Sequence, residues 1–573
     1  MAKRRMITGK RIVWIVVISV SAFLVGINIV RPSTPLPVYA ESPPVLIGRV
    51  MESQGQPVSG AEVAVYLNSE EEPAVIGESQ PGGVFTLELP SGSISSLRVE
   101  IKRHHFNATT WVAEADDLEH LRRGEALRLP DITLKRRITP SFWIATLTFI
   151  GILLLIAFEK LHSTMAALLG MAIVLGVSLV GRPINEGLFI FDLKQALQYV
   201  DFNVIFLVMG MMIAIGIIEE TGIFQWLAYQ AYRLSRGRPW LLITILMVIT
   251  SVASALLDNV TTMLLMTPMT LQIGLALGIN PLSLLLPEVL ASNVGGISTL
   301  IGTPTNILVG SYADISFNDF LLNLTPGVLL AQIALTVYVL VIYRKEYASV
   351  SGRPSPALLE HLREHARITE PVKLRRAGAV FIGMLLLFTI GERIHLVPAV
   401  TAILGSVTML MAVESDIEEM LKVVDWTTLM FFTALFIVVG AIQEVGLLSF
   451  IATGIKAVVG ENLTAALLVL IWAGAILSGI IANIPFTAAM LPVVGFLTRT
   501  IPGAGSKVLF YGLSVGSAMG GNSSLIGASA NLVTAGIAER AGYPITYRQF
   551  LKIGFPAMII TVATGTLWLF IRF

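Results

Sequence analysis

The sequence LLDNVTTMLLMTP (residues 256–268), followed by SNVGGISTLIGTPTN (292–306), returns in altered form about 225 positions later. The second copies read IIANIPFTAAMLP (480–492) and SAMGGNSSLIGASAN (517–531). In a hydrophobic chain, a duplication whose copies share segments interrupted by glycine and proline indicates the midplane binding site of a secondary transporter. Transport is therefore the first functional hypothesis. Corresponding positions include Asn259 and Asn483, Gly296 and Gly521, and Asn306 and Asn531.

The composition of the chain indicates a membrane protein. Its 573 residues are 54% hydrophobic and 13% charged, with a mean hydropathy of +0.77. A soluble globular chain carries about 25% charged residues, roughly twice this share. The net charge of +1 identifies no partner, because in a membrane protein only the distribution of Lys and Arg is informative. We expect the lipid bilayer as a partner and no nucleic acid. The chain has no cysteine, which excludes disulfides and thiolate metal sites.

Residues 1–40 are predicted to form a signal peptide or a signal anchor. Five basic residues up to Arg11 precede the apolar run 12–30, and a small-residue cleavage site follows at Ala40. The apolar run is also long enough to stay as a spanning helix, and this retained anchor is the preferred interpretation. Both interpretations place the next segment outside the cytoplasm.

Residues 44–136 alternate apolar and polar side chains, with turn residues between the runs. This period-2 pattern predicts a small extracytoplasmic β-sandwich. The segment resembles the carboxypeptidase-regulatory-like fold, whose pattern is found at 48–63 and 83–90. The pair His104-His105 is interpreted as solvated at a strand edge in preference to a metal site.

From residue 140 onward the sequence predicts two transporter repeats, 140–345 and 377–573, joined by a basic linker at 346–376. Each repeat contains five spans and one re-entrant hairpin, at 239–275 and 463–499. The hairpins are interrupted at mid-depth, where irregular backbone is tolerated only inside the protein or beside a cavity. The predicted spans are 142–158, 164–180, 202–219, 284–312, 326–343, 378–395, 398–413, 427–443, 507–537 and 554–572.

The predicted topology follows from the number of spans and from the basic residues. Eight Lys and Arg residues between positions 344 and 376 place the linker in the cytoplasm. Five spans per repeat is an odd number, so the second repeat is inverted relative to the first. Residue 140 then lies outside, next to the extracytoplasmic β-domain. The chain is expected to be a polytopic α-helical, multi-pass protein of a bacterial-type plasma membrane, with eleven spans if the anchor is retained.

The four motifs quoted above also carry a family resemblance. They are similar to the branch of the ion transporter superfamily that contains the P protein, the arsenite pumps and NhaD-type sodium/proton antiporters. Divalent-anion:sodium symporters and citrate-transporter-like domains are related to this branch. The resemblance implies a scaffold domain, a homodimer, and a mobile transport domain that works by an elevator-type mechanism.

The sequence departs from the family pattern at both hairpin tips. Close relatives of the P protein carry Asp-Asn at both tips, whereas the second tip here is Ala482-Asn483. The symporters carry Ser-Asn-Thr, where this chain has Asp258-Asn259-Val260-Thr261. The first difference removes an ionisable group, and the second argues against sodium-coupled dicarboxylate uptake.

Asp258 is the principal candidate for ion binding, because an intramembrane carboxylate is costly and is read as functional by default. It would coordinate a cation or carry a proton, or it would cap the second hairpin helix; both roles can hold together. A sodium ion is predicted at Asp258, Asn259 and Gly296, since hard cations accept neutral oxygen ligands. Further hairpin candidates are Thr261, Thr262, Asn483 and Thr487.

Four glycines are also candidates, because glycine lets the backbone approach a ligand or adopt positive φ. The alternative is tight helix packing by small residues. Glu288, a lone acid in an early turn of the first broken helix, is a weaker candidate for a proton relay. The glycines are Gly295, Gly296, Gly520 and Gly521, and the remaining site candidates are Asn293, Ser298, Thr299, Asn306, Asn522, Ser523 and Asn531.

The sequence thus predicts a transporter and not an enzyme, without a cofactor and with sodium or proton as the coupling ion. Two substrate hypotheses stay open: sodium/proton exchange, or transport of a small anion such as arsenite, chloride or a carboxylate. None of the four motifs contains a basic residue, which weighs against a multivalent anion held by charge. A sensor with a vestigial transport core is the alternative from another class, and the polar groups in both repeats argue against it.

Overall fold

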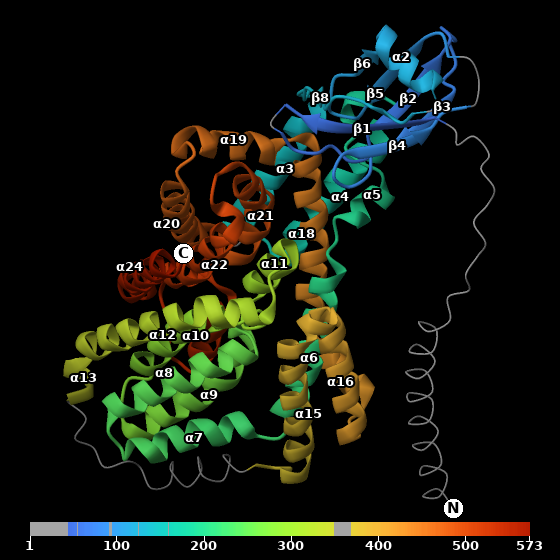
Figure 1. The fold of residues 1–573 in the computed structure, drawn as a ribbon. Coiled ribbons are helices and arrows are strands. Elements are labelled where there is room, and N and C mark those ends of the chain that lie inside the picture. Colours follow the sequence, from blue (N-terminus) through green and yellow to red (C-terminus); the bar gives the residue numbers. More distant parts are fainter. Residues whose placement is uncertain (1–43, 54, 91–93, 124, 159, 349–367) are drawn as a thin grey trace, which may run out of the picture. The chain divides into compact units, whose positions relative to one another are not determined.

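The computed structural model describes residues 44–348 and 368–573, apart from residues 54, 91–93, 124 and 159 (Figure 1). The predicted signal peptide or anchor, 1–40, lies outside the described residues, as does most of the predicted linker 346–376. The chain divides into two compact units. One contains most of the β-strands and ends at Ile132, and the other contains residues 51–56, 103–107 and 133–573.

The N-terminal strands form two four-stranded sheets, with one helix, α2 (Ala115–Arg122), after the sixth strand (Figure 1). Buried and exposed side chains alternate along β4 and β5, as expected for strands with one covered face. The predicted small β region is therefore confirmed. One sheet pairs β4 (Val84–Glu88), β1 (Val45–Glu52), β7 (Leu127–Arg128) and β8 (Ile132–Leu134), and the other has the order β3 (Val75–Glu78), β2 (Glu62–Leu67), β5 (Leu97–Lys102), β6 (Thr109–Val112).

The rest of the chain is helical, and ten helices in the described residues are long and apolar enough to cross a membrane. Each half begins with three long helices. Asp201 precedes and caps α6 in the first half, and Asp425 precedes and caps α18 in the second. Each carboxylate accepts a hydrogen bond from a backbone N–H of the first turn, which satisfies a free donor. The helices are α3 (Pro140–Ala157), α4 (Ser163–Gly181) and α6 (Phe202–Glu219), then α15 (Pro371–Ile390), α16 (Pro398–Val413) and α18 (Trp426–Val445).

Each half continues with a hairpin, a broken helix and a final long helix, in the same order. Shorter helices lie between them: α5 (Leu193–Gln198), α7 (Ile223–Ser235), α13 (Arg344–Ala348), α17 (Ile417–Val423) and α19 (Leu447–Val459). The first half contains the hairpin α8 (Pro239–Leu256)–α9 (Asn259–Leu277), the broken helix α10 (Leu282–Gly295)–α11 (Pro304–Ala313), and α12 (Phe317–Ile342). The second half contains α20 (Leu463–Ile481)–α21 (Asn483–Thr500), α22 (Val508–Gly520)–α23 (Ser529–Arg540), and α24 (Tyr547–Arg572).

The two halves interlock through matched contacts. The first part of each broken helix packs on its own hairpin, α10 on α8 and α22 on α20. The second part packs on the hairpin of the other half, α11 on α21 and α23 on α9. The long helices α12 and α24 pack on each other, while α6 packs on α16 and α4 on α18 (Figure 1). This arrangement brings all four sequence motifs into one region.

A proline in α10 shows how the fold satisfies an interrupted helix. Pro287 has no N–H, so the carbonyl of Ser283 loses its intrahelical donor. The Tyr347 hydroxyl donates to that carbonyl at 2.7 Å. A side chain from α13 thereby completes the hydrogen bonding of the buried α10.

Candidate functional site

Both hairpin tips carry a strained residue that is not glycine. Asp258 has φ 138° and ψ 161°, and Ala482, at the matched position, has φ 75° and ψ 144°. Such conformations cost about 1–3 kcal/mol each and persist where the surrounding structure imposes them. The backbone distortion is thus shared by the two halves even though the side chains differ.

The side chain of Asp258 caps the second hairpin helix. One carboxylate oxygen accepts from the Thr261 backbone N–H at 2.8 Å, and the other accepts from the Thr261 hydroxyl at 2.8 Å. The Thr262 hydroxyl donates to the Asp258 carbonyl at 2.6 Å. The capping role considered from the sequence is therefore present. Asp258 is half-buried, so its carboxylate keeps acceptor positions for a further ligand.

A chain of buried amide side chains joins three of the four motifs. The Asn259 amide donates to Asn293 Oδ1 at 2.8 Å. The two N–H groups of the Asn293 amide then donate to Asn522 Oδ1 and to Asn531 Oδ1, each at 2.9 Å. These four residues are at most 4% exposed. Asn293 therefore ties the first hairpin to the broken helix of the other half.

Two asparagine side chains, one in each half, donate hydrogen bonds to backbone carbonyls at the breaks in the helices. The Asn306 amide donates to the carbonyls of Ile297 and Thr299, at 2.9 and 2.8 Å. In the second half, the Asn531 amide donates to the carbonyls of Gly521 and Ser524, at 2.8 and 2.9 Å. Carbonyls at a helix end lack intrahelical donors, and these amides supply them.

Two of the candidate asparagines have a buried amide oxygen without a hydrogen-bond donor. Within the described residues, Asn259 Oδ1 and Asn306 Oδ1 have no hydrogen-bond partner. Leaving such an acceptor unpaired costs about 1–3 kcal/mol, and amide oxygens are suitable ligands for a hard cation. Asn531 Oδ1, the counterpart of Asn306 Oδ1, is occupied by Asn293. The free acceptors therefore lie in the first half, together with Asp258.

The candidate glycines serve helix packing. A Cβ atom added to Gly295 would lie 2.4 Å from the Ser251 carbonyl oxygen, and one added to Gly520 would lie 2.6 Å from the Ala475 carbonyl oxygen. Gly296 and Gly521 lie instead against the carbonyls of Gly302 and Gly527, within the break of their own broken helix. All four have negative, helical φ values, so the expected positive φ is wrong. The absent side chains let each hairpin contact its broken helix directly.

Two candidate hydroxyls, those of Thr299 and Ser523, lie between a hairpin and its broken helix. Thr299 donates to the Ala255 carbonyl, while the carbonyl of Ser298 accepts from Thr325 at 3.1 Å. A Cβ atom added to Gly479 would lie 1.9 Å from Ser523 Oγ, which places this hydroxyl against the second hairpin.

Thr487 does not join this network, since its hydroxyl donates to the Asn483 carbonyl in the same helix at 2.7 Å. No group of three metal-binding side chains occurs in the described part of the chain. The sodium site at Asp258, Asn259 and Gly296 stays a prediction.

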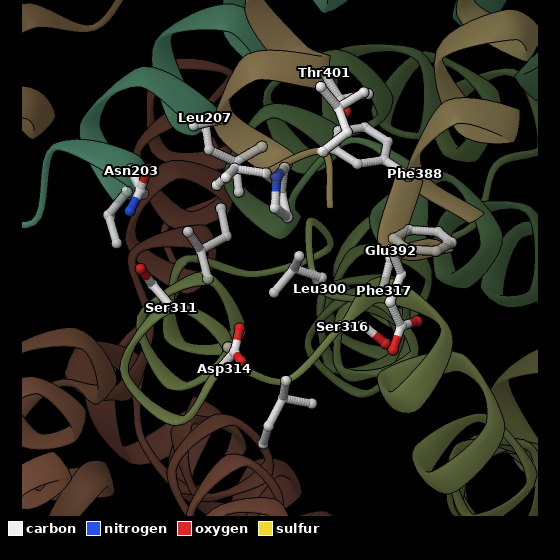
Figure 2. Close-up of a pocket in the computed structure, with 18 of the residues that line it drawn as sticks. Asn203, Leu207, Leu300, Ser311, Asp314, Ser316, Phe317, Phe388, Glu392 and Thr401 are labelled. Atoms are coloured by element: carbon white, nitrogen blue, oxygen red, sulfur yellow. The ribbon is translucent and has the colours of Figure 1, made fainter. Parts of the chain in front are cut away.

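A pocket of about 340 Å³ lies elsewhere, and the sequence did not indicate it. Figure 2 shows Asn203 of α6, Ser311 of α11, Asp314 and Glu392 around the same hollow. The volume is within the range of small-molecule sites. None of the predicted site residues lines it. Apart from Leu300, its residues lie outside the four motifs, so the motifs gave no signal for it.

Comparisons with known proteins place the chain among transporters. The profile of a family described as "Citrate transporter" matches residues 153–506. An uncharacterized transporter of Mycobacterium tuberculosis is 36% identical over 432 residues, which cover 75% of this chain and 98% of the relative. The human P protein is 33% identical over 516 residues, covering 76% of this chain and 61% of that protein. The solved YdaH transporter of Alcanivorax borkumensis has a TM-score of 0.48 and 12% identity, covering 75% of this chain and 98% of that one.

Proposed function

Because this chain belongs to the citrate transporter family, we propose that it is a secondary active transporter in which a proton or sodium gradient drives a small ion or anion across the membrane. The observation that carries this proposal is the buried amide chain from Asn259 through Asn293 to Asn522 and Asn531. Polar groups are costly at membrane depth unless they serve a pathway or a site. We place the protein in the bacterial cell membrane.

The proposed cation site lies at the first hairpin tip. It uses the free oxygens of Asn259 and Asn306, which lack donors among the described residues, and the capped carboxylate of Asp258. The second half offers Ala482 in place of the acid. A single cation in the first half is therefore the favoured stoichiometry, since among the described hairpin tips and helix breaks those of the first half combine an acid with unpaired amide oxygens.

The proposed mechanism is elevator-type alternating access by two inverted repeats. The cross-packing of α11 on α21 and of α23 on α9 supports a core in which both hairpins and both broken helices move together. The helices α3, α4, α6, α15, α16 and α18 would form the scaffold, which would mediate homodimer contacts. Rigid-body movement of one group of helices against another is a common basis for alternating access.

Sodium/proton exchange is the favoured activity within this proposal, because the four motifs carry one acid and no base. Transport of a small anion is the second candidate. It is favoured by the family description and by the two helix N-termini at Pro304 and Ser529, which begin next to the breaks. Helix N-termini bind anions through free N–H groups and the helix dipole.

Purified protein in sealed vesicles distinguishes these activities. An imposed sodium gradient is expected to move protons in the opposite direction if the protein is an exchanger. Saturable uptake of labelled citrate or arsenite would support the anion candidate. A protein that moves none of these would contradict the proposal and support a sensor.

Asp258→Asn tests the acid directly. The variant keeps an oxygen that can accept from Thr261 but loses the negative charge. We expect it to fold as the wild type does and to lose sodium-dependent flux, since the cation would lose its only charged ligand. Wild-type flux in this variant would remove Asp258 from the mechanism.

A further inference from the structure

Glu288 is a fully buried acid whose position the cation site does not explain. It lies on α10 at 0% exposure, in a helix whose residues from Ser283 to Gly295 are all buried. Five residues separate it from Asn293, a rise of about 7.5 Å along the helix. An isolated charge at such a position is strongly disfavoured in a membrane protein. The group therefore needs either a cation or a proton.

No cation reaches it in the described residues. The helix α13 contacts α10 through Tyr347, and its Arg344, Lys345 and Glu346 do not interact with Glu288. The other helices that pack on α10 are α8, α9, α12, α22, α23 and α24, and α8 and α9 contain no acidic or basic residue. The charged residues of the others occupy the first or last two turns of their helices, and none interacts with Glu288. These residues are Asp319, Glu539, Arg540, Arg548, Lys552 and Arg572.

Two threonines from the first hairpin surround the carboxyl group instead. The Thr250 hydroxyl donates to Glu288 Oε1 at 2.7 Å, and the Thr270 hydroxyl faces the same group. Glu288 Oε2 and Thr270 Oγ1 have no hydrogen-bond partner within the described residues. A proton on Oε2 turns this oxygen into a donor, and Thr270 Oγ1 is an acceptor. The arrangement suits a neutral carboxylic acid.

The second half shows that packing does not require this cluster. By the register of the repeat, Glu288 corresponds to Leu513, Thr250 to Gly474 and Thr270 to Val494. The register holds in the structure: Ser254 donates to the Ser292 carbonyl in the first half, and Ser478 donates to the Ser517 carbonyl in the second. The three corresponding helices, α20, α21 and α22, therefore pack in the second half without a polar side chain at any of the three positions. The polar cluster is an addition specific to the first half.

We propose that Glu288 is the proton-binding group of the transport cycle, which holds its proton in the state described here and releases it to water when a cation occupies the site at Asn259 and Asn306. The released proton leaves a carboxylate, and the bound cation compensates its charge. The Thr250 hydroxyl donates to the carboxyl group in both states. This inference rests on the proposed function and names its coupled ion.

Infrared spectroscopy of the purified protein tests proton occupancy without requiring transport. At neutral pH, the wild type is expected to show the carbonyl band of a protonated carboxylic acid that Glu288→Gln lacks. Glu288→Leu, which copies Leu513 of the second half, serves if the Gln variant fails to fold. Glu461→Gln, at an exposed position, is the matched control and should keep the band. A band that persists in both Glu288 variants would overturn the inference.

Addition of sodium chloride, with choline chloride as the control, tests whether cation binding releases the proton of Glu288. It should reduce the band and acidify an unbuffered solution of the wild type but not of Glu288→Gln. In vesicles, a wild type that moves sodium or solute without protons would overturn the inference and leave the proposed function standing. A wild type that moves no ion and no solute would overturn both. Wild-type proton flux in Glu288→Gln would overturn the inference alone.

Discussion

At the scale of single residues, the sequence predicted which amide side chains belong to the candidate site but not which of them contact each other. The repeat predicted one shared site for Asn259 and Asn531, which have asparagine counterparts in the other half, and for Asn293 and Asn522, which lie in matched motifs without an amide counterpart. It did not predict which amides contact each other, since that depends on how the two halves interlock. The strain at Ala482 also gave no signal, because the sequence pattern of a hairpin tip does not report φ.

His105 differs from its sequence-based interpretation as a solvated residue. It is buried, with ring contacts of 3.3 Å to the Thr139 hydroxyl and the Ile190 carbonyl. Burial lowers the pKa of His105 from 6.5 to about 4, because it disfavours the charged ring. His104, next to it in sequence, is exposed. Adjacent residues at a strand end can therefore face opposite environments.

This burial predicts an acid sensitivity of folding. Above pH 6.5 the ring is neutral in both states and has no pH-dependent effect. As the pH falls from 6.5 to about 4, the unfolded chain binds a proton that the folded chain does not, so stability falls by up to roughly 3 kcal/mol. Thermal unfolding against pH measures this loss. His105→Asn, which suits the φ of 68° at this position, should lose less stability over that range. An equal loss of stability in the wild type and in His105→Asn would contradict the conclusion that the burial of His105 causes the loss.

At the scale of elements, the order of helices followed the sequence closely. The predicted hairpin at 239–275 corresponds to α8 and α9, which span Pro239–Leu256 and Asn259–Leu277. Glycine, proline and aspartate mark helix ends through local backbone chemistry, so their positions transfer directly to the structure. The packing of α11 on α21 and α23 on α9 is a long-range property that no local pattern encodes.

The close contact of hairpin and broken helix predicts an unequal response to alanine at two glycines. Gly295→Ala would place a Cβ atom 2.4 Å from the Ser251 carbonyl oxygen, and we expect it to lower stability by about 1–3 kcal/mol. Gly536→Ala, in α23 with no neighbour near its Cβ position, should raise stability by roughly 0.5–1 kcal/mol. Thermal unfolding in detergent compares the two. Equal effects would argue against the packing role of Gly295.

At the scale of the whole molecule, the sequence identified a duplicated membrane protein with a small β region, and the structure agrees. The pocket beside Asn203, Ser311 and Asp314 was not foreseen, because all its lining residues except Leu300 lie outside the four motifs. The main functional feature is that the two halves differ in their buried acids and amide groups. The first half contains Asp258, the unpaired amide oxygens of Asn259 and Asn306, and Glu288. The second half has Ala482 and Leu513 at the positions that correspond to the two acids.

The central claim is that one buried site, tied together by Asn293, couples ion movement across both halves. Ion flux through vesicles that contain wild-type protein or Asn293→Ala tests it most directly. The variant loses the bonds to Asn522 and Asn531, each worth about 1 kcal/mol. We expect sodium- or proton-driven flux in the wild type and a loss of roughly tenfold or more in the variant. Undiminished flux in correctly folded Asn293→Ala, or no ion-driven flux in the wild type, would contradict the account.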